Sequence, residues 1–399
     1  MALATLVNTV GNGMFMTLSA LFFTHVVGLS IGRVGVGLTI AGVVGLVGGV
    51  PIGHLADRRG PRGIYVTMLV VQAVVMVAYL AVHSFWAFVI VETLGQLAQG
   101  GSSSAKGPII RRLGGDAPAH FRAYLRSITN VGIALGALAA GFAVEVDTPT
   151  AYRVLVGVNA ASFLVAALII VRIPALEPTA APPGQHTWVA LRDRPYLTVT
   201  ALNGLMSIQF AVLVLGLPLW VAGHTHAPRW TIAAAMLVNT AIVALFQVRA
   251  GRGVDTPRKA GLVFRRSGWV FIASCSLVAL AADVSAWWLA VGVLLVGAVV
   301  HTVGELWHQA AAFELGYGLA ADHAQGQYQG VFGLGQGVAG ALEPLVMTLC
   351  LAAGQFGWIG FGVGLALVGT LMPAVANWAT TNRPGTRAEL VAEPQPALG

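Results

Sequence analysis

The chain has 399 residues, of which 57% are hydrophobic and only 9% are charged. Soluble domains carry roughly 25% charged residues, and a water-soluble chain this apolar would lack the polar surface to cover itself. The composition therefore excludes an ordinary soluble domain and indicates that much of the surface faces lipid. The formal net charge of +7 does not indicate nucleic-acid binding, because the basic residues lie between apolar runs rather than on a patch interleaved with aromatic side chains.

Apolar segments recur along the whole chain at the length that a membrane helix needs. A helix requires about 20 apolar residues to cross the hydrocarbon layer, and only helices or closed barrels satisfy their backbone hydrogen bonds in lipid. These runs are too long and too uniformly apolar for barrel strands. Twelve membrane helices are predicted, over residues 4–26, 34–55, 63–82, 85–108, 127–146, 152–172, 196–222, 230–249, 267–283, 286–313, 328–351 and 356–378.

Basic residues gather in every second loop between these helices. When the loops are placed alternately inside and outside, starting inside, nineteen Lys and Arg residues fall inside, and three, Arg33, Arg153 and Arg229, fall outside. Cytoplasmic loops carry such an excess of positive charge. We therefore expect a multi-pass protein of the cell membrane with both termini in the cytoplasm, whose basic loops contact anionic lipids of the inner leaflet.

A stretch rich in Pro and Ala divides the chain near its midpoint. We predict a six-helix bundle over 1–172, a cytoplasmic linker over 173–194, a second six-helix bundle over 195–380 and a flexible cytoplasmic tail over 381–399. Two loops support a duplication, because "GHLADRRGPRG" and "GRGVDTPRKAG" each place Asp, at Asp57 and Asp255, four residues after their first Gly. Chance similarity of two basic loops is the alternative. Duplicated halves with a site between them are a common transporter design.

The sharpest motif is the loop from Gly53 to Arg62, "GHLADRRGPR". Its glycines permit close helix packing and unusual backbone angles. The stretch resembles the signature loop G-x-L-A-D-R-x-G-x-R of the major facilitator superfamily. The resemblance implies an all-α polytopic membrane protein with twelve helices in two pseudo-symmetric six-helix bundles around a central cavity. All seven fixed positions match: Gly53, Leu55, Ala56, Asp57, Arg58, Gly60 and Arg62.

By the same resemblance, this loop is a conformational latch at the cytoplasmic helix ends. Asp57 is expected to meet the backbone around Gln327 to Gly330, because a helix N-terminus favours an anion. Lys106, Arg111 or Arg112 is expected to supply a neighbouring cation. A solvated turn whose arginines only set the topology is the alternative. The latch residues are Gly53, Asp57, Arg58, Gly60, Arg62 and Arg112.

Small residues recur in the fifth predicted helix at Gly132, Gly136 and Gly141, where they provide a flat face for close helix contact. The segment resembles the G-x3-G-P-x2-G-G motif of drug/proton antiporters, except that Ala137 replaces the Pro and Ala140 replaces a Gly. This partial match places the chain closest in pattern to the multidrug efflux branch. Ordinary packing of small residues is the alternative.

Three glutamates, Glu92, Glu305 and Glu343, lie inside predicted membrane helices. A charge there costs at least ~2.5 kcal/mol and usually faces a cavity. Burial favours the neutral carboxyl group, so Glu305 can hold a proton and release it when water enters. All three are candidates for proton coupling, as is His301, one turn before Glu305 on the same face. A structural hydrogen bond is the alternative for each. Glu314 lies near a helix end and is expected to be wet.

Helices one, four, seven and ten line the central cavity in the superfamily, which makes their polar and aromatic residues candidates for binding cargo. Asn and Gln side chains at mid-span would be costly against hydrocarbon, which independently favours an inward orientation, whereas simple packing is the alternative for each Met and Phe. No Lys or Arg lies in the central parts of these helices, which argues against a strongly anionic cargo. The candidates are Asn8, Asn12, Phe15, Met16, Glu92, Gln96, Gln99, Asn203, Met206, Gln209, Phe210 and Trp307.

Together these features predict a secondary active transporter that exports small apolar or amphipathic, neutral or cationic molecules in exchange for protons. A nutrient importer or uniporter of the same fold and a lipid flippase are the alternatives. The chain contains no nucleotide-binding loop and no zinc-protease motif, so we expect no enzyme activity, no cofactor, no metal and no nucleic-acid partner. The expected partners are a small-molecule substrate and protons, and the protein is expected to be a monomer.

Overall fold

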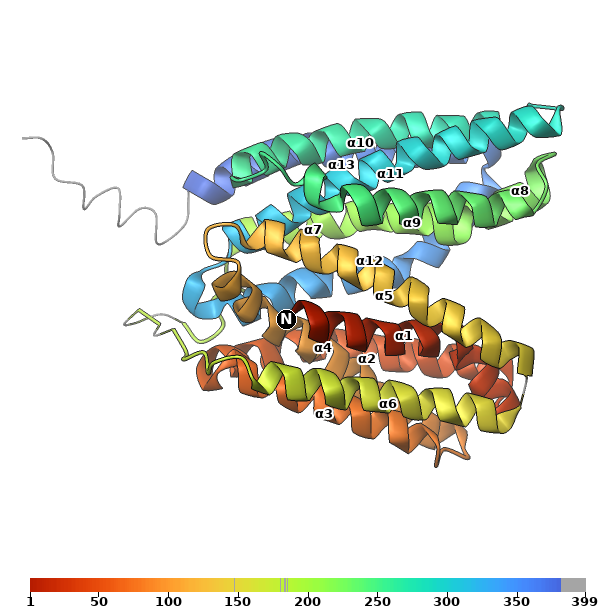
Figure 1. Cartoon of the computed structure of the whole chain (residues 1–399). Coiled ribbons are helices and arrows are strands. Elements are labelled where there is room, and N and C mark those ends of the chain that lie inside the picture. The colour runs from red at the N-terminus through yellow and green to blue at the C-terminus, as the bar shows by residue number, and fades with distance from the viewer. Residues whose placement is uncertain (147, 180, 183, 185, 382–399) are drawn as a thin grey trace, which may run out of the picture. The chain divides into compact units, whose positions relative to one another are not determined.

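Long α-helices make up nearly all of the structure (Figure 1). The computed structural model describes residues 1–146, 148–179, 181, 182, 184 and 186–381, and every regular element in them is helical. The first half contains α1 (Ala2–Leu21), η1 (Phe22–Val26), α2 (Ile31–Arg59), α3 (Pro61–Tyr79), α4 (Phe85–Leu113), α5 (Pro118–Val146) and α6 (Pro149–Val171). The second half contains α7 (Arg194–Ser207), η2 (Ile208–Phe210), η3 (Val212–Gly216), α8 (Leu217–His224), α9 (Trp230–Ala250), α10 (Pro257–Leu280), α11 (Trp287–Gly318), η4 (Asp322–Ala324), α12 (Gln325–Ala352) and α13 (Gly354–Thr381).

The twelve predicted spans correspond to twelve long helical segments in the described part of the chain. Ten of these segments are long and apolar enough to cross a membrane. The other two, α1 and α4, carry polar side chains near mid-helix, including Asn12 and Glu92. The predicted boundaries differ mainly at polar ends, where a helix continues past its apolar run. For example, α10 begins at Pro257, ten residues before the predicted start, because Thr256 caps it and polar residues fill its first turns.

Local sequence signals set the helix starts. Hydroxyl side chains accept a hydrogen bond from the third residue of the following helix at Ser30, Ser84, Thr148 and Thr256. This contact satisfies one of the backbone amides that a helix leaves without a partner. Pro follows the cap directly in α6 and α10, where its fixed φ angle suits the first helical position.

The seventh predicted span is helical throughout but changes its pitch at mid-length. Regular helix ends at Ser207, a 3-10 turn follows in η2, and a π-helical turn follows in η3 before α8 resumes at Leu217. Pro218 has no amide hydrogen, so it cannot donate the hydrogen bond that would continue a regular helix through η3. Such π-helical turns are frequent at functional sites.

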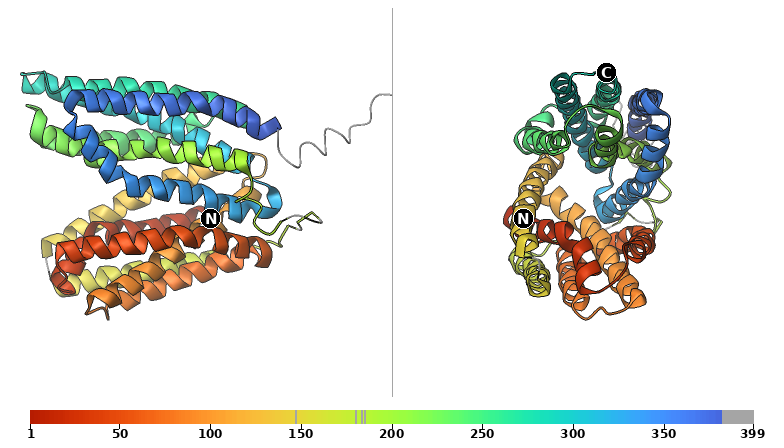
Figure 2. Two further views of the ribbon diagram at one scale, coloured as in Figure 1. Left: turned by 180° about the vertical axis from the view of Figure 1, so that it is seen from behind. Right: turned by 90° about the vertical axis from the view of Figure 1, so that its right-hand side faces the viewer.

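The described chain divides into two compact units. The first contains Met1–Trp188 together with Ala321–Leu334, and the second contains Val189–Ala320 with the described residues from Gly335 onward. In the first unit, α2 packs on α4, α3 packs on α4 and α6, and α1 packs on α5 and α6. Figure 2 shows these helices from two further sides.

The second unit repeats the pairing pattern of the first. Its α9 packs on α11, α10 packs on α11 and α13, and α7 packs on α13. These pairs match those of α2, α3, α4, α6 and α1 when α7 is aligned with α1. Even the close contact of α1 with α5 has a counterpart, because a Cβ atom on Gly335 of α12 would lie 2.9 Å from the Thr200 carbonyl oxygen of α7. This repetition is what a duplicated helical bundle requires.

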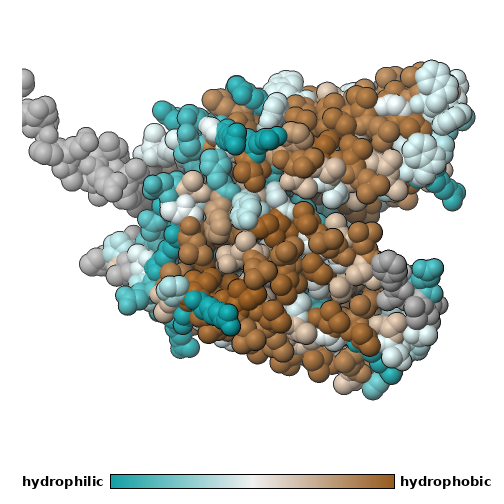
Figure 3. All heavy atoms as spheres, in the orientation of Figure 1, coloured by the Kyte–Doolittle hydropathy of each residue, from teal (hydrophilic) through white to brown (hydrophobic). Residues whose placement is uncertain are grey.

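The outer surfaces of both units are apolar along the sides of their helices. Figure 3 shows hydrophobic residues over the helix sides and hydrophilic residues gathered near the helix ends. Large side chains such as Val47 of α2, Val74 of α3 and Leu367 of α13 are more than half exposed. Apolar surface on this scale is not tolerated in water, so it indicates contact with lipid.

Two of the three fifth-helix glycines bring α5 against α1. A Cβ atom on Gly132 would lie 2.1 Å from the Thr9 hydroxyl oxygen, and one on Gly136 would lie 2.1 Å from the Val10 carbonyl oxygen. Gly141 does not share this role, because nothing in the described chain lies within 4 Å of its Cβ position. The predicted packing face therefore covers Gly132 and Gly136 and ends before Gly141.

We expect Gly136→Ala to lower the stability of the purified protein by about 1–3 kcal/mol, the usual cost of overpacking, because backbone atoms of α1 cannot move aside as a side chain can. Gly141→Ala is the matched control, and it should be neutral or slightly stabilising because Ala favours helix by ~1 kcal/mol. Melting temperatures in one detergent provide the measurement. Equal melting temperatures for the two variants would show that α1 and α5 do not approach as described.

Candidate functional site

The signature loop joins α2 to α3 through a glycine in an unusual conformation. Gly60 has φ +97° and ends α2, and Pro61 begins α3. A side chain would be strained at this φ angle. The tight turn keeps Asp57 near the end of α2 and Arg62 near the start of α3. Each of these side chains makes contacts outside the loop.

The carboxylate of Asp57 is docked on the first turn of α12. Its Oδ1 atom accepts a hydrogen bond of 2.8 Å from the Gly326 amide, and its Oδ2 atom accepts one of 3.0 Å from the Gln327 amide. The first amides of a helix have no partner inside it, and the helix dipole favours negative charge there. The superfamily resemblance predicts contacts around Gln327 to Gly330, whereas the structure places them one residue earlier because only the first turn of α12 offers such amides.

Two glycines let α2 approach α12 closely enough for this contact. A Cβ atom on Gly53 would lie 2.2 Å from the Gly326 carbonyl oxygen, and one on Gly326 would lie 2.3 Å from the Gly53 carbonyl oxygen. One turn further along both helices, a Cβ atom on Gly330 would lie 2.6 Å from the Gly49 carbonyl oxygen. Any larger residue at these positions would push the two backbones apart and withdraw Asp57 from its amides.

Arg58 and Arg62 of the motif do not form an ion pair with Asp57. The Arg62 guanidinium donates hydrogen bonds to the carbonyl oxygens of Val171 (3.3 Å) and Ile173 (2.7 Å), where α6 ends. Arg58 is exposed. Arg62 therefore ties the α2–α3 turn to the segment that follows α6.

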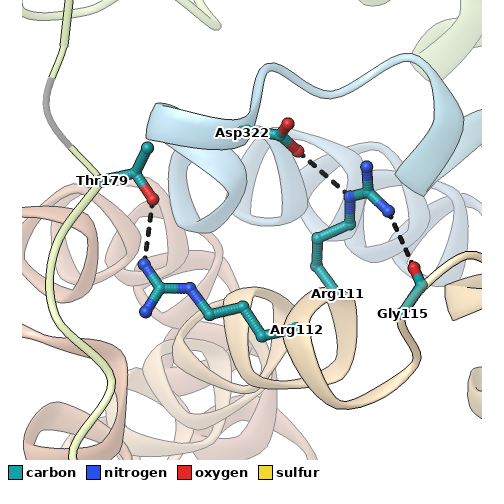
Figure 4. Close-up of polar contacts among 5 residues, drawn as sticks. All are labelled: Arg111, Arg112, Gly115, Thr179 and Asp322. Atoms are coloured by element: carbon teal, nitrogen blue, oxygen red, sulfur yellow. Dashed lines mark hydrogen bonds and ion pairs between the residues drawn. The ribbon is translucent and has the colours of Figure 1, made fainter.

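Two arginines of α4 that are expected as cations near Asp57 bind other partners. Arg111 of α4 forms an ion pair with Asp322 at 3.1 Å and donates to the Gly115 carbonyl oxygen, and Arg112 donates to the Thr179 hydroxyl group (Figure 4). Both arginines and Asp57 line one cavity of about 460 Å³. Both arginines therefore share a cavity with Asp57 as neighbouring cations, but partners before α12 and after α6, rather than its carboxylate, bind their guanidinium groups.

The segment after α6 also reaches α12. The Gln327 side-chain amide donates to the Thr187 carbonyl oxygen at 3.1 Å and lies 2.7 Å from the Nδ1 atom of His54. The ring of His54 lies against Trp188, with centroids 4.8 Å apart. Residues of the predicted linker thus pack on the same end of the first unit as the Asp57 contact, which no sequence signal indicated.

Glu92 forms a buried polar cluster in the first unit. It is 6% exposed, and its two oxygens accept hydrogen bonds from the Tyr79 hydroxyl group and, at 2.8 Å, from the Gln96 side-chain amide. The ring of Phe15 stacks on Tyr79 with centroids 5.5 Å apart. The structure therefore brings together the three cavity candidates Phe15, Glu92 and Gln96. It adds Tyr79 of α3, which the sequence analysis missed because an apolar helix pattern does not show which side chains of two helices meet.

Glu305 is the corresponding buried carboxyl group of the second unit. It lies in α11 and is 6% exposed, and its Oε2 atom accepts a hydrogen bond of 2.7 Å from the Asn239 side chain of α9. Glu343 of α12 is half-buried. Glu314 is only 8% exposed, so the expectation that it is wet is wrong, because α11 continues to Gly318, beyond its predicted end.

Further polar candidates are buried where the seventh span changes pitch. The Asn203 side-chain oxygen lies 3.1 Å from the Nε2 atom of His308 in α11. The side chain of Gln209 and the Nδ1 atom of His301 are buried and have no hydrogen-bond partner among the described residues. Unpartnered buried polar groups cost ~1–3 kcal/mol each, so this region is suited to water, protons or cargo. The remaining candidates are Met206, which is fully buried, and Phe210 and Trp307, which are half-buried.

Polar candidates of α1 and α4 line a second cavity of the first unit. This cavity has a volume of about 240 Å³, and its lining includes Asn8, Asn12, Met16 and Gln99. The Asn12 side-chain amide donates to the Asn8 side-chain oxygen at 3.3 Å. In the residues that the structure describes, no group of three or more His, Cys, Asp or Glu side chains is arranged to hold a metal ion.

The fold and these contacts define a multi-pass membrane transporter. The family profile described as Major Facilitator Superfamily matches residues 1–344, most of the chain. The chain therefore belongs to the major facilitator superfamily, whose members are secondary transporters that work by alternating access rather than enzymes. The predicted all-helical membrane fold is confirmed.

Solved structures share this fold over nearly the whole chain. The human organic anion transporter MFSD10 (TETRAN) is 15% identical with a TM-score of 0.64, and the match covers 95% of this chain and 96% of that chain. A bacterial homologue of the iron transporter ferroportin in an outward-facing state is 14% identical with a TM-score of 0.74, covering 96% and 98%. The structure of such a homologue with soaked iron is 15% identical with a TM-score of 0.73 and the same coverage. Comparison with curated proteins finds no match.

We expect Asp57→Asn to speed amide hydrogen exchange at Gly326 and Gln327 by about tenfold or more, since a hydrogen bond to a charged group is worth ~1.5–3 kcal/mol. The substitution removes the charge and turns one acceptor into a donor that faces an N–H group. Asp116→Asn is the control, because Asp116 is exposed and lines the same cavity. Unchanged protection of these two amides in Asp57→Asn would rule out the contact.

Proposed function

We propose that this superfamily member exports small amphipathic molecules from the cell in exchange for protons. The likeness of the signature loop to that of the superfamily, and of the segment Gly132 to Gly141 to drug/proton antiporters, supports the direction and the coupling. The distribution of basic residues supports a place in the cell membrane with both termini in the cytoplasm and anionic lipids around the basic loops. We expect the transporter to act as a monomer.

The observation that carries the proton coupling is a buried carboxyl group in each unit that accepts hydrogen bonds from neutral donors. Glu305 is bonded by the Asn239 amide, and Glu92 by Tyr79 and Gln96. Burial of a carboxyl group away from water favours its neutral form. A proton bound at such a group in a dry state of the site and released when water enters would supply the cycle that coupling requires.

In this proposal Asp57 controls which state is populated. Its two hydrogen bonds form on the α2–α3 end of the first unit, and a contact of this kind stabilises whichever state contains it. Movement of the first turn of α12 away from Gly53 would break both hydrogen bonds at once. The contact is therefore suited to hold one state of the transport cycle and to release it.

The contacts of the buried glutamates bear on the charge of the cargo. The sequence predicts a neutral or cationic cargo, and a buried carboxylate would suit a cation, but Glu92 already accepts hydrogen bonds at both oxygens. The cavity beside Asn8 and Asn12 is lined by basic residues instead. The geometry thus gives less support to a cationic cargo than the sequence does.

Transport is tested in vesicles that expose the cytoplasmic face and hold an acid lumen, with three fluorescent probes of matched structure: dansylate (anionic), dansylamide (neutral) and dansyl-ethylenediamine (cationic). We expect at least one probe to accumulate above protein-free vesicles and to leave when a protonophore is added. Glu305→Gln should abolish this accumulation, because Gln carries no proton, while exchange of preloaded probe persists.

Glu145→Gln is the control for this experiment, because Glu145 is an exposed carboxyl group at the end of α5. It should transport as the unmodified protein does. Accumulation that survives the protonophore, or full gradient-driven accumulation by Glu305→Gln, would contradict proton exchange at this residue. Accumulation driven only when the cytoplasmic face lies inside the vesicle would favour an importer.

Substitution of Asp57 tests the proposed latch. Asp57→Asn should abolish gradient-driven accumulation of the same probe while leaving the amount of protein inserted in the membrane unchanged, because the helices and their apolar surfaces are not altered. Membrane insertion is measured by immunoblotting of the vesicle fraction. Transport at the unmodified rate by this variant would remove Asp57 from the mechanism.

A further inference from the structure

The cavity of about 240 Å³ in the first unit has an unusual charge balance. It lies between α1, α3, α4 and α5, and three of its lining side chains, Lys106, Arg122 and Arg126, are basic. None of the described residues that line it is acidic. The volume is below the ~300–1,000 Å³ of pockets that enclose drug-sized ligands, so the cavity suits a small molecule or the charged end of a larger one.

Lys106 is the lining residue that most requires a partner. It is half-buried in α4, and it makes no hydrogen bond or ion pair within the part of the chain that the structure describes. Arg122 of α5 lines the same cavity, so two positive charges that repel each other border it. A charge removed from water without a counter-ion is strongly unfavourable, so an anion in the cavity would relieve both the repulsion and the lost solvation.

The side-chain amide of Asn8 also lacks a hydrogen-bond acceptor. The Nδ2 atom of Asn8 is buried and has no hydrogen-bond partner among the described residues, although its side-chain oxygen accepts a hydrogen bond from Asn12. An amide N–H donor is suited to an oxygen of a carboxylate or sulfonate. The cavity therefore combines a cation and a neutral donor that both lack an acceptor.

We propose that this cavity binds the carboxylate or sulfonate group of an amphipathic organic anion, with Lys106 as its ion-pair partner and Asn8 as a hydrogen-bond donor. The apolar side chains of Met16, Leu69 and Ile133 also line the cavity and supply a surface for the hydrocarbon part of the ligand. This inference rests on the proposed function, because it names the class of cargo that the exporter carries.

The length of α4 explains why the sequence pointed to another cargo. The apolar run that predicts the fourth span ends at residue 108, which places Lys106 at its edge, as a candidate cation for the latch. The helix continues to Leu113, so Lys106 lies about two turns inside it, where it lines a cavity together with residues of α1.

Chemical labelling tests the site on the intact protein, because the sequence contains only two lysines, Lys106 and Lys259. Acetic anhydride is applied to the purified chain in neutral detergent, and the acetylation of each lysine is followed by mass spectrometry. We expect dansylate at ten times its Kd to slow acetylation of Lys106 by about tenfold. Lys259, which pairs with Asp255 in the second unit, is the internal control and should react at an unchanged rate.

The three dansyl probes share one ring system and differ in charge, so they distinguish recognition of the negative charge from recognition of the ring. Dansylamide and dansyl-ethylenediamine should leave Lys106 reactive at the same concentration. Protection by all three probes, or no protection by dansylate up to millimolar concentration, would overturn the proposal. Protection by phosphatidylglycerol but not by dansylate would also overturn it, because the occupant would then be a lipid head group.

Substitution of Lys106 gives an independent measurement. Lys106→Gln should weaken dansylate binding, followed by its fluorescence, by about tenfold, and Lys106→Arg should retain it. The melting temperature without ligand should not fall in Lys106→Gln, since the side chain has no partner to lose, and Lys259→Gln should bind normally. A destabilised Lys106→Gln with unchanged affinity would show a structural role instead. Binding needs no pH gradient, so these results stand apart from the transport experiment, and either can fail alone.

Discussion

The contact between the Asp57 carboxylate and the first amides of α12 depends on a constraint that only glycine satisfies. Gly53 and Gly326 remove the two Cβ atoms that would otherwise separate the backbones, and the first turn of a helix supplies amides that lack partners. The geometry of the whole end of the first unit follows from this approach. Because the carboxylate is bound by two amides rather than by an arginine, its contact requires one position of the helix start and is lost when that position changes.

The arginines around this contact bind the connecting segments rather than the start of α12. Arg62, Arg111 and Arg112 bind backbone or side-chain oxygens of the segments next to α6 and α12, so they fix the connecting segments while Asp57 fixes the helix. A single surface ion pair contributes little by itself. The Arg111–Asp322 ion pair acts together with the hydrogen bonds of Arg62 and Arg112 to join separate segments and restrict how they can move. We interpret the linker as part of this end of the unit rather than as a passive tether.

Much of the fold could be predicted from the sequence, because a membrane helix is recorded in every residue of an apolar run of the required length. Such runs predict the twelve helical segments. The spacing of small residues in the fifth segment likewise predicts the close contacts of Gly132 and Gly136. Pairing between distant side chains is not recorded in this way, so the partners of Arg112 and Glu92 became known only from the structure. Helix extension past the apolar run explains two further differences, the burial of Glu314 and the position of Lys106 inside α4, in the lining of a cavity.

The central claim, that the start of α12 must leave α2 during transport, is tested most directly by joining the two helices. Cysteines at His54 and Gln327, whose side chains lie 2.7 Å apart, are introduced into a chain that lacks Cys275 and Cys350, and a short cross-linker cleavable by a reducing agent connects them. Our account predicts that cross-linking stops accumulation of the dansyl probe and that reduction restores it, with no effect on either single cysteine variant. Unchanged accumulation by the cross-linked protein would contradict it.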